Sequence, residues 1–332
     1  MKKKGKGIAI MYYPIGSTGK ANAGSAIVTI HHDGTATAAI GTVDEGQGAT
    51  TVMSQIVAEV LGIEFNHIRL LTADTETTPY DHGTGANRST YIVGNAIKEA
   101  TEKARDLLFS AAARKLNVLD YRKLDCKNEV VFLKGFPDKS MTIAEAAWYS
   151  ERVLGVPIIA SASFTPAVSG LDPETGFGKA FENHVFATQI AEVEVDTETG
   201  EVELLKITAS HDCGTALNRL LAAGQIEGGI SMGVGYALTE NYIENLQDGS
   251  LLSRSFTDYK IPTINDMPKE TIIDIVEMPE EEGPFGAKGL GEPTNMPTAP
   301  AIINAIHDAI GVFITDLPAT PEKILQALKN KE

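Results

Sequence analysis

The sequence is poor in cysteine, in basic residues and in long hydrophobic runs. Its two cysteines, Cys126 and Cys213, are far apart and outside any CxxC pattern. They predict neither a cysteine-held metal or iron–sulfur site nor the disulfide framework of a small secreted domain. No apolar run approaches the roughly 20 residues that a membrane-spanning helix needs. The start, "MKKKGKGIAIMYYP", lacks the apolar core and cleavage site of a secretion signal. We therefore expect a cytoplasmic protein without a membrane partner.

The charge balance is acidic, with 28 Lys and Arg against 44 Asp and Glu and a formal net charge of -16. A nucleic-acid-binding face normally appears as a basic patch. The basic cluster at residues 1–6 is interpreted as a solvated terminus, so no nucleic-acid partner is expected. The seven histidines form no HExxH pattern, which argues against a zinc ion held by protein side chains.

The pattern of elements predicts an α+β fold with a weak internal duplication. Two alternating runs meet at Asp33-Gly34 within residues 25–41, and two more meet at a "TETG" turn within residues 185–212. Both are hairpin signals. Helical spacing or strand composition marks further elements, which are expected as helices at 50–62, 89–116, 299–310 and 321–329 and strands at 67–73 and 271–276. Two α/β subdomains are predicted, residues 1–165 and 166–332.

Four glycine-rich loops, at residues 41–48, 83–94, 214–229 and 283–292, are the candidate ligand-binding segments. Because helix N-termini and loop amides bind anions, loops that open onto helices favour a cofactor with phosphate groups. No P-loop or Rossmann pattern is present, which argues against nucleoside triphosphate chemistry. Gln47 and Gln225 carry amides that could pair with the edge of a heterocycle. Each could instead be an ordinary turn or helix-start residue.

Four motifs in order resemble the C-terminal half of the molybdenum-binding subunit of the xanthine dehydrogenase and aldehyde oxidase family. They are "GTVDEGQGATTVMSQIVAE", "TGANRSTYIVGNAI", "HDCGTALNRLLAAGQIEGGISMGVGYALTE" and "GPFGAKGLGEPTNMPTAPAIINAIHDAIG". The resemblance implies molybdopterin cytosine dinucleotide, whose molybdenum carries a sulfido or selenido ligand and no protein side chain. It assigns the cofactor to Gly46, Gln47, Gly48, Thr84, Gly85, Ala86, Asn87, Arg88, Ser89, Thr90 and Gln225.

Within that set the resemblance implies separate roles. Gln47 and Gln225 would contact the pterin, Ser89 and Thr90 would hold phosphate, and Ala86 would lie close to the metal with Gly85.

The glutamate of the family's "GxGEP" motif corresponds to Glu292, which the resemblance makes the catalytic base. Lys288, in the same motif, would orient or neutralise nearby charge or lie on the surface. Candidate substrate residues are Tyr12, Tyr13, His82 and Arg88, since a cation could meet a carboxylate and a tyrosine could stack or hydrogen-bond. Each of the four could also be structural.

The sequence departs from the fused family pattern, because it lacks the GGxFG-type loop and any iron–sulfur or flavin segment. We expect a naturally split molybdenum subunit, inactive alone, with a larger molybdopterin subunit, an Fe-S subunit and an FAD subunit as partners. This organisation is similar to that of nicotinate dehydrogenase, in which electrons reach a nicotinamide acceptor. The implied substrate is a nicotinate-like N-heteroaromatic acid. A purine, an aldehyde and a non-catalytic scaffold role are the alternatives.

Overall fold

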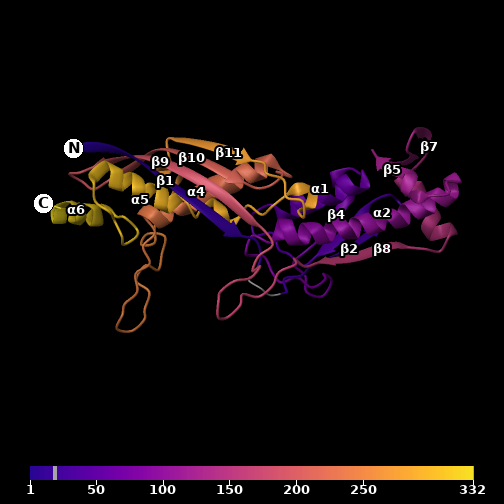
Figure 1. The fold of residues 1–332 in the computed structure, drawn as a ribbon, viewed down its shortest axis with the longest axis horizontal. Coiled ribbons are helices and arrows are strands. Elements are labelled where there is room, and N and C mark those ends of the chain that lie inside the picture. Colours follow the sequence, from indigo (N-terminus) through magenta and orange to yellow (C-terminus); the bar gives the residue numbers. More distant parts are fainter. Residues whose placement is uncertain (18–20, 332) are drawn as a thin grey trace. The chain divides into compact units, whose positions relative to one another are not determined.

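The computed structural model describes residues 1–17 and 21–331, and the chain divides into two compact units (Figure 1). Unit 1 comprises Met1–Tyr13, His184–Met278 and Leu290–Glu332, and unit 2 comprises Pro14–Asn183 and Pro279–Gly289. Both units are discontinuous in sequence and do not coincide with the ranges 1–165 and 166–332. Those ranges remain a prediction about cofactor-binding subdomains.

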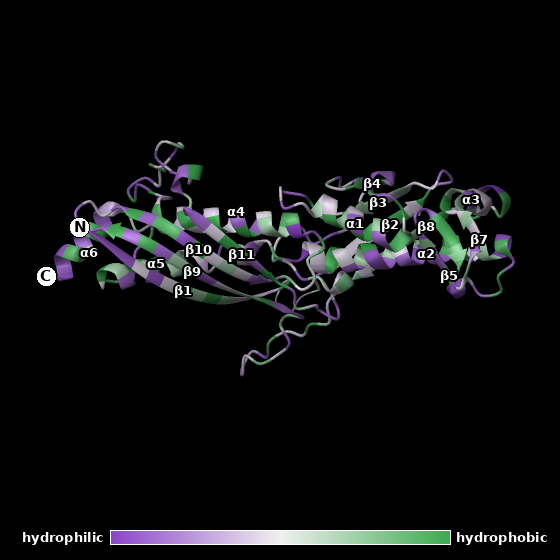
Figure 2. Cartoon of the chain, turned by 90° about the horizontal axis from the view of Figure 1, so that it is seen from above, coloured by the Kyte–Doolittle hydropathy of each residue, from purple (hydrophilic) through white to green (hydrophobic). Residues whose placement is uncertain are grey.

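Unit 1 is a four-stranded sheet packed with helices. In sheet order its strands are β1 (Lys2–Pro14), β9 (His184–Asp196), β10 (Val202–Asp212) and β11 (Glu270–Val276), and its helices are α4 (Arg219–Leu238), α5 (Thr298–Ile310) and α6 (Pro321–Lys331). Hydrophobic and hydrophilic residues alternate along β9 and β10 (Figure 2). One face of the hairpin therefore joins α4 and α5 in a buried core that includes Val193 and Ile230.

Strand β1 was not predicted: the lysines of residues 1–6 are exposed, as expected of a solvated terminus, but the segment is a strand of the sheet. Its inward positions include Gly5, where an added Cβ would lie 2.1 Å from the carbonyl oxygen of Ala305 in α5. On the outward side, the ammonium of Lys2 lies 2.8 Å from the carboxylate of Glu194 on β9. A strand is usually recognised by alternating apolar residues. In β1 small residues face a helix and charged residues face a neighbouring strand instead.

Among its described residues, unit 2 contains a second four-stranded sheet, a small three-stranded sheet and three α-helices. The first sheet has the order β4 (Ile68–Leu71), β3 (Ala36–Ile40), β2 (Gly24–Ile30) and β8 (Ile158–Phe164); the small one contains β5 (Leu124–Lys127), β6 (Val130–Leu133) and β7 (Phe136–Thr142); the helices are α1 (Ala49–Leu61), α2 (Gly94–Leu116) and α3 (Ile143–Trp148). In both larger sheets an antiparallel hairpin is flanked by a strand parallel to its second arm. This shared order agrees with the predicted internal duplication.

The α+β class and most predicted elements are confirmed. Helix α1 ends at Gly62, whose φ of 64° is the left-handed conformation that glycine adopts readily. The helix expected at 89–116 consists of a π-helical turn, Ser89–Val93, followed by α2. No helix in residues 1–17 and 21–331 is long and apolar enough to cross a membrane.

The prediction of a loop at 214–229 is wrong beyond residue 218. Asn218 caps α4 by accepting a hydrogen bond from the backbone N–H of Leu221 at 3.0 Å. The glycines of this segment lower helix propensity, but Ile226 and Ile230 are completely buried against the sheet. Tertiary packing therefore overrides the local preference. Consequently Gln225 lies on a helix and not in a loop.

Candidate functional site

The predicted site residues fall in both units. Tyr13, Gln225 and Glu292 belong to unit 1, and the residues of the loops at 41–48 and 83–90 belong to unit 2. Each group has its own local architecture.

Glu292 opens a short 3-10 turn, Glu292–Thr294, that leads toward α5. Its side chain is exposed, whereas the two residues that follow, Pro293 and Thr294, are buried. The Thr294 hydroxyl donates to the carbonyl of Gly291 at 2.7 Å and closes the turn around Glu292. A rigid turn thus presents a carboxylate at the surface of unit 1.

Tyr13 is the direct partner of this carboxylate. Its phenol donates a hydrogen bond to Oε2 of Glu292 at 2.5 Å. Burial raises the pKa of Tyr13 above its usual range, and the hydrogen bond to Glu292 and that carboxylate's charge raise it further. The phenol therefore remains a donor at any working pH. Tyr12 points to the opposite face of β1 and lies 5.7 Å, centroid to centroid, from His184.

The loop at 41–48 is organised by Asp44, which the sequence interpretation missed. Its carboxylate accepts from the backbone N–H groups of Gly46 at 2.9 Å, Gly48 at 3.2 Å and Thr50 at 2.9 Å. Burial alone would raise the pKa of Asp44, but these bonds and one from the Thr50 hydroxyl lower it. The Asp44 carboxylate therefore already provides a negative charge at the N-terminus of α1. An aspartate two residues before a glycine turn is the signal that could have identified it.

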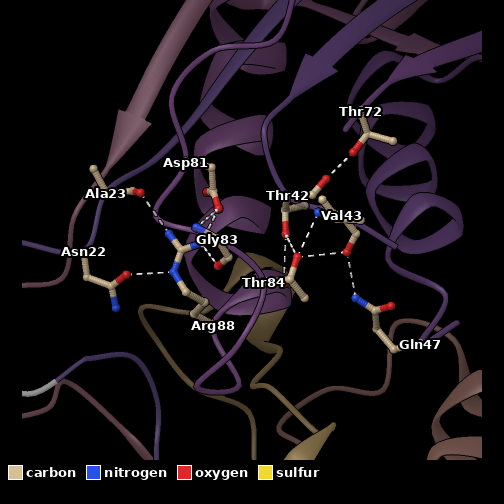
Figure 3. Close-up of polar contacts among 11 residues, drawn as sticks. Asn22, Ala23, Thr42, Val43, Gln47, Thr72, Asp81, Gly83, Thr84 and Arg88 are labelled. Atoms are coloured by element: carbon tan, nitrogen blue, oxygen red, sulfur yellow. Dashed lines mark hydrogen bonds and ion pairs between the residues drawn. The ribbon is translucent and has the colours of Figure 1, made fainter. Parts of the chain in front are cut away.

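Gln47 braces the same loop with both ends of its amide. Its Oε1 accepts from the N–H of Glu45 at 2.6 Å, and its Nε2 donates to the carbonyl of Val43 at 3.0 Å (Figure 3). Gln47 could contact a heterocycle or stabilise a turn, and the structure shows the turn-stabilising role. A contact between Gln47 and a heterocycle remains a prediction.

Arg88 is the centre of a buried hydrogen-bond network (Figure 3). Its side chain is 1% exposed, and its guanidinium pairs with Asp81 at 2.5 Å. It also donates to Asn22 at 2.7 Å and to the carbonyls of Ala23 and Gly83 at 2.8 Å. Asp81 neutralises the charge of Arg88 and the loops enclose it, so a contact between Arg88 and a substrate carboxylate remains a prediction. Arg88 fixes the shape of the loop at 83–90.

Hydroxyl groups join the two loops of unit 2. Thr42 Oγ1 lies 3.1 Å from Thr84 Oγ1 and 3.0 Å from Ser89 Oγ, and the Thr84 hydroxyl also accepts from the N–H of Val43 at 2.8 Å (Figure 3). Ser89 and Thr90 both lie in the π-helical turn before α2. The structure brings together the predicted residues Thr84 and Ser89 through Thr42, which was not predicted.

The backbone at 83–87 has an unusual shape. Gly83, Gly85, Ala86 and Asn87 all have positive φ values, 113°, 154°, 49° and 57°. The backbone at Asn87 packs directly against Gly289, which precedes Glu292 in the same motif. A Cβ on Gly289 would lie 2.1 Å from the carbonyl oxygen of Asn87. This close backbone approach at Gly289 serves packing within unit 2. Strained loop residues of this kind concentrate at functional sites.

Several glycines of the predicted cofactor-binding segments have open space beside them in their own unit. A Cβ on Gly46, Gly83 or Gly85 would meet no atom of the described chain within 4 Å, and the same holds for Gly224 and Gly228 on α4. Gln225 lies between the last two and is partly exposed. Within residues 1–17 and 21–331, no hydrogen-bond partner is assigned to its amide. The predicted contact surfaces are accessible in each unit, as a bound cofactor requires.

The remaining candidate residues are His82 and Lys288. His82 is exposed, and Lys288 is partly buried in unit 2. Among the described residues, no group of three or more His, Cys, Asp or Glu side chains could hold a metal ion.

Comparison with known proteins identifies the chain. Residues 1–268 match the family model of the molybdopterin cofactor-binding domain. The putative xanthine dehydrogenase molybdenum-binding subunit of Escherichia coli K12 is 31% identical over 98% of this chain and 42% of its own length. The aldehyde oxidoreductase of Megalodesulfovibrio gigas is 34% identical over 98% of this chain and 32% of its own.

A solved structure agrees with these sequence relatives. The quinoline 2-oxidoreductase of Pseudomonas putida 86 superposes with a TM-score of 0.88 and 26% identity, over 99% of this chain and 42% of that one. The chain therefore belongs to the molybdopterin cofactor-binding domain family of xanthine dehydrogenase type, as the four motifs predicted. It spans less than half the length of the relatives that it matches.

Proposed function

We propose that the chain is part of a multi-subunit molybdenum hydroxylase that oxidises an N-heteroaromatic substrate with an oxygen atom derived from water. The observation that carries the proposal is the hydrogen bond between Tyr13 and Glu292. Residues far apart in the sequence, each proposed for the reaction, meet at an exposed carboxylate held on a rigid turn.

Molybdopterin cytosine dinucleotide would be bound by the glycine-rich loop at 46–48, the segment 84–90 and Gln225. When bound, the cofactor supplies a metal that activates the water-derived oxygen and accepts two electrons from the substrate carbon. In the protein, Asp44 and Gln47 hold the first loop, and Arg88 holds the second. The chain thus keeps these loops folded for the ligand.

Glu292 would act as the general base. Its carboxylate takes the proton released as the water-derived oxygen attacks the substrate carbon. Tyr13 donates to Oε2 and holds the carboxylate in one orientation. Because its raised pKa keeps Tyr13 protonated, the phenol does not compete with Glu292 for the proton.

A nicotinate-like acid is the leading substrate. The names of two relatives, a putative xanthine dehydrogenase subunit and quinoline 2-oxidoreductase, refer to nitrogen-containing aromatic rings. The name of a third, aldehyde oxidoreductase, keeps an aldehyde as an alternative. A larger molybdopterin subunit would complete the pocket. Fe-S and FAD subunits would then carry electrons to NAD(P).

The proposal is tested on the complex purified with its natural partners. Elemental and nucleotide analysis should find molybdenum and cytosine dinucleotide equimolar with this chain. Turnover is then compared for nicotinate, quinoline, xanthine and an aromatic aldehyde with NAD(P) as acceptor. A purine or aldehyde preference would overturn the substrate assignment. A native complex without molybdenum would instead support the non-catalytic scaffold role.

A further inference from the structure

A completely buried amide lies directly behind the Glu292 turn. Gln189 on β9 is 0% exposed. Its Nε2 donates to the carbonyl of Thr294 at 3.0 Å, and its Oε1 accepts from the Thr298 hydroxyl at 2.7 Å. One side chain of the sheet therefore holds both the end of the turn and the first residue of α5.

These contacts fix the orientation of the amide and the tautomer of its neighbour. The Thr294 carbonyl can only accept and so requires the NH2 end of Gln189. The second hydrogen of that group points to Nε2 of His211, 3.0 Å away. His211 Nε2 must therefore be the acceptor, which places the ring proton on Nδ1. Within residues 1–17 and 21–331, that buried Nδ1 has no hydrogen-bond partner.

Helix α4 also packs closely against the turn and the first residue of α5. A Cβ on Gly229 would lie 2.1 Å from Oγ1 of Thr294, and a Cβ on Gly233 would lie 2.3 Å from Cβ of Thr298. Thr294 is 3% exposed and Thr298 is 0% exposed. Thr294 and Thr298 are thus in contact both with the backbone of α4 and with the Gln189 amide.

We infer that Gln189, held by neutral His211, is a positioning residue that sets the orientation of the Glu292 turn. A buried imidazole with an unpaired N–H is unfavourable for stability. Two apolar side chains would fill the same space without that penalty. Unlike apolar side chains, Gln189 and His211 provide an oriented hydrogen bond to the carbonyl of Thr294, which is two residues from Glu292. The inference rests on the proposed role of Glu292 as base.

The first test measures the turn itself, without activity. Gln189→Met keeps the side-chain length and removes all three bonds, and Thr298→Val removes one of them at nearly constant volume. Amide hydrogen exchange of the segment 290–297 in the full chain is expected to be faster in both variants than in the wild type.

Thr101→Val is the matched control. Thr101 is also a completely buried helical threonine, but its hydroxyl bonds to the carbonyl of Ile97 in unit 2. This variant should leave exchange in 290–297 unchanged. Wild-type exchange of 290–297 in folded Gln189→Met overturns the inference. If that variant does not fold, wild-type exchange in Thr298→Val overturns it.

The second test separates positioning from general damage in the purified complex. Gln189→Met is expected to lower kcat on the order of 10²-fold, as a misplaced catalytic group does. KM and the molybdenum content should remain near wild type. In a Glu292→Gln background the same substitution should cause little further loss.

The two outcomes are separable. Equal losses from Gln189→Met in both backgrounds would overturn the positioning role. Full activity of Glu292→Gln alone would instead overturn the proposed base, while the exchange measurement would still report whether Gln189 orders the turn.

Discussion

The phenol oxygen of Tyr13 lies 2.5 Å from Oε2 of Glu292, although 279 positions separate the two residues. Tyr13 is near the end of β1, and Glu292 begins the turn before α5. Because the phenol stays protonated, the hydrogen bond has one direction, from tyrosine to carboxylate. The pair orients the carboxylate that we propose as the base.

Tyr13→Phe is expected to lower kcat about tenfold, because the Glu292 carboxylate loses the hydrogen bond that holds it in one orientation. Molybdenum content should not change, since Tyr13 is not among the cofactor-binding residues. Tyr12→Phe is the matched control, because Tyr12 lies on the other face of β1. Equal losses of kcat in Tyr13→Phe and Tyr12→Phe would show that the hydrogen bond from Tyr13 to Glu292 does not contribute to turnover.

The two glutamines proposed to contact the pterin should behave differently in the cofactor-free chain. Gln47→Met removes two bonds within its own loop and should lower the free energy of unfolding by about 1–2 kcal/mol. Gln225→Met removes no assigned hydrogen bond of the described chain and should leave it unchanged. Both variants should retain less cofactor. Thermal unfolding and bound cytosine nucleotide are the measurements, and full cofactor retention in Gln225→Met would exclude its contact.

The buried pair of Arg88 and Asp81 predicts a large stability effect. Asp81→Asn leaves a buried guanidinium without its counter-charge and should destabilise unit 2 by about 3–5 kcal/mol. Urea unfolding followed by the fluorescence of Trp148, the single tryptophan, measures this in unit 2. The exposed pair Glu99 and Lys103, 2.8 Å apart, is the control. Glu99→Gln should cost no more than about 0.5 kcal/mol.

His211 predicts a pH dependence of stability, because burial lowers its pKa to about 4 from the ordinary 6.5. Between these pH values the unfolded chain binds a proton that the folded chain does not. The free energy of unfolding should therefore fall as pH drops from 6.5 to 4, by up to about 3 kcal/mol from this group.

The measurement for His211 compares wild type with His211→Gln by denaturant unfolding across that pH range. The contribution of His211 should be absent in the variant. His82→Gln, altered at an exposed position, should keep the wild-type slope. Identical slopes in wild type and His211→Gln would contradict the neutral, buried state.

Elements with strong local signals were predictable from the sequence. The Asp33-Gly34 turn and Gly62 mark their hairpin and helix end through backbone conformation alone. Strand β1 was missed because its inward positions are small, such as Gly5 and Gly7, and its outward ones include lysines. Their fit to α5 and to glutamates of β9 depends on tertiary structure.

Within the candidate site, the sequence motifs identified the loops but not the role of each side chain. Gln47 and Arg88 look like ligand-binding groups in the sequence. Their bonds to Val43 and Asp81 show that they also shape their own loops. Gln189 and His211 were not predicted, because the partner of a polar residue between strands is set by the folded chain. Asp44 was missed although its spacing from Gly46 is a local signal.

The role of Glu292 as base is tested by Glu292→Gln in the purified complex, which replaces the carboxylate by an amide of the same shape. Turnover of the N-heteroaromatic substrate is expected to fall by at least about 10²-fold, the scale of general acid–base catalysis. Molybdenum and cytosine dinucleotide content should remain at wild-type levels. Wild-type kcat in a fully loaded Glu292→Gln complex would contradict the central claim that this carboxylate is the base.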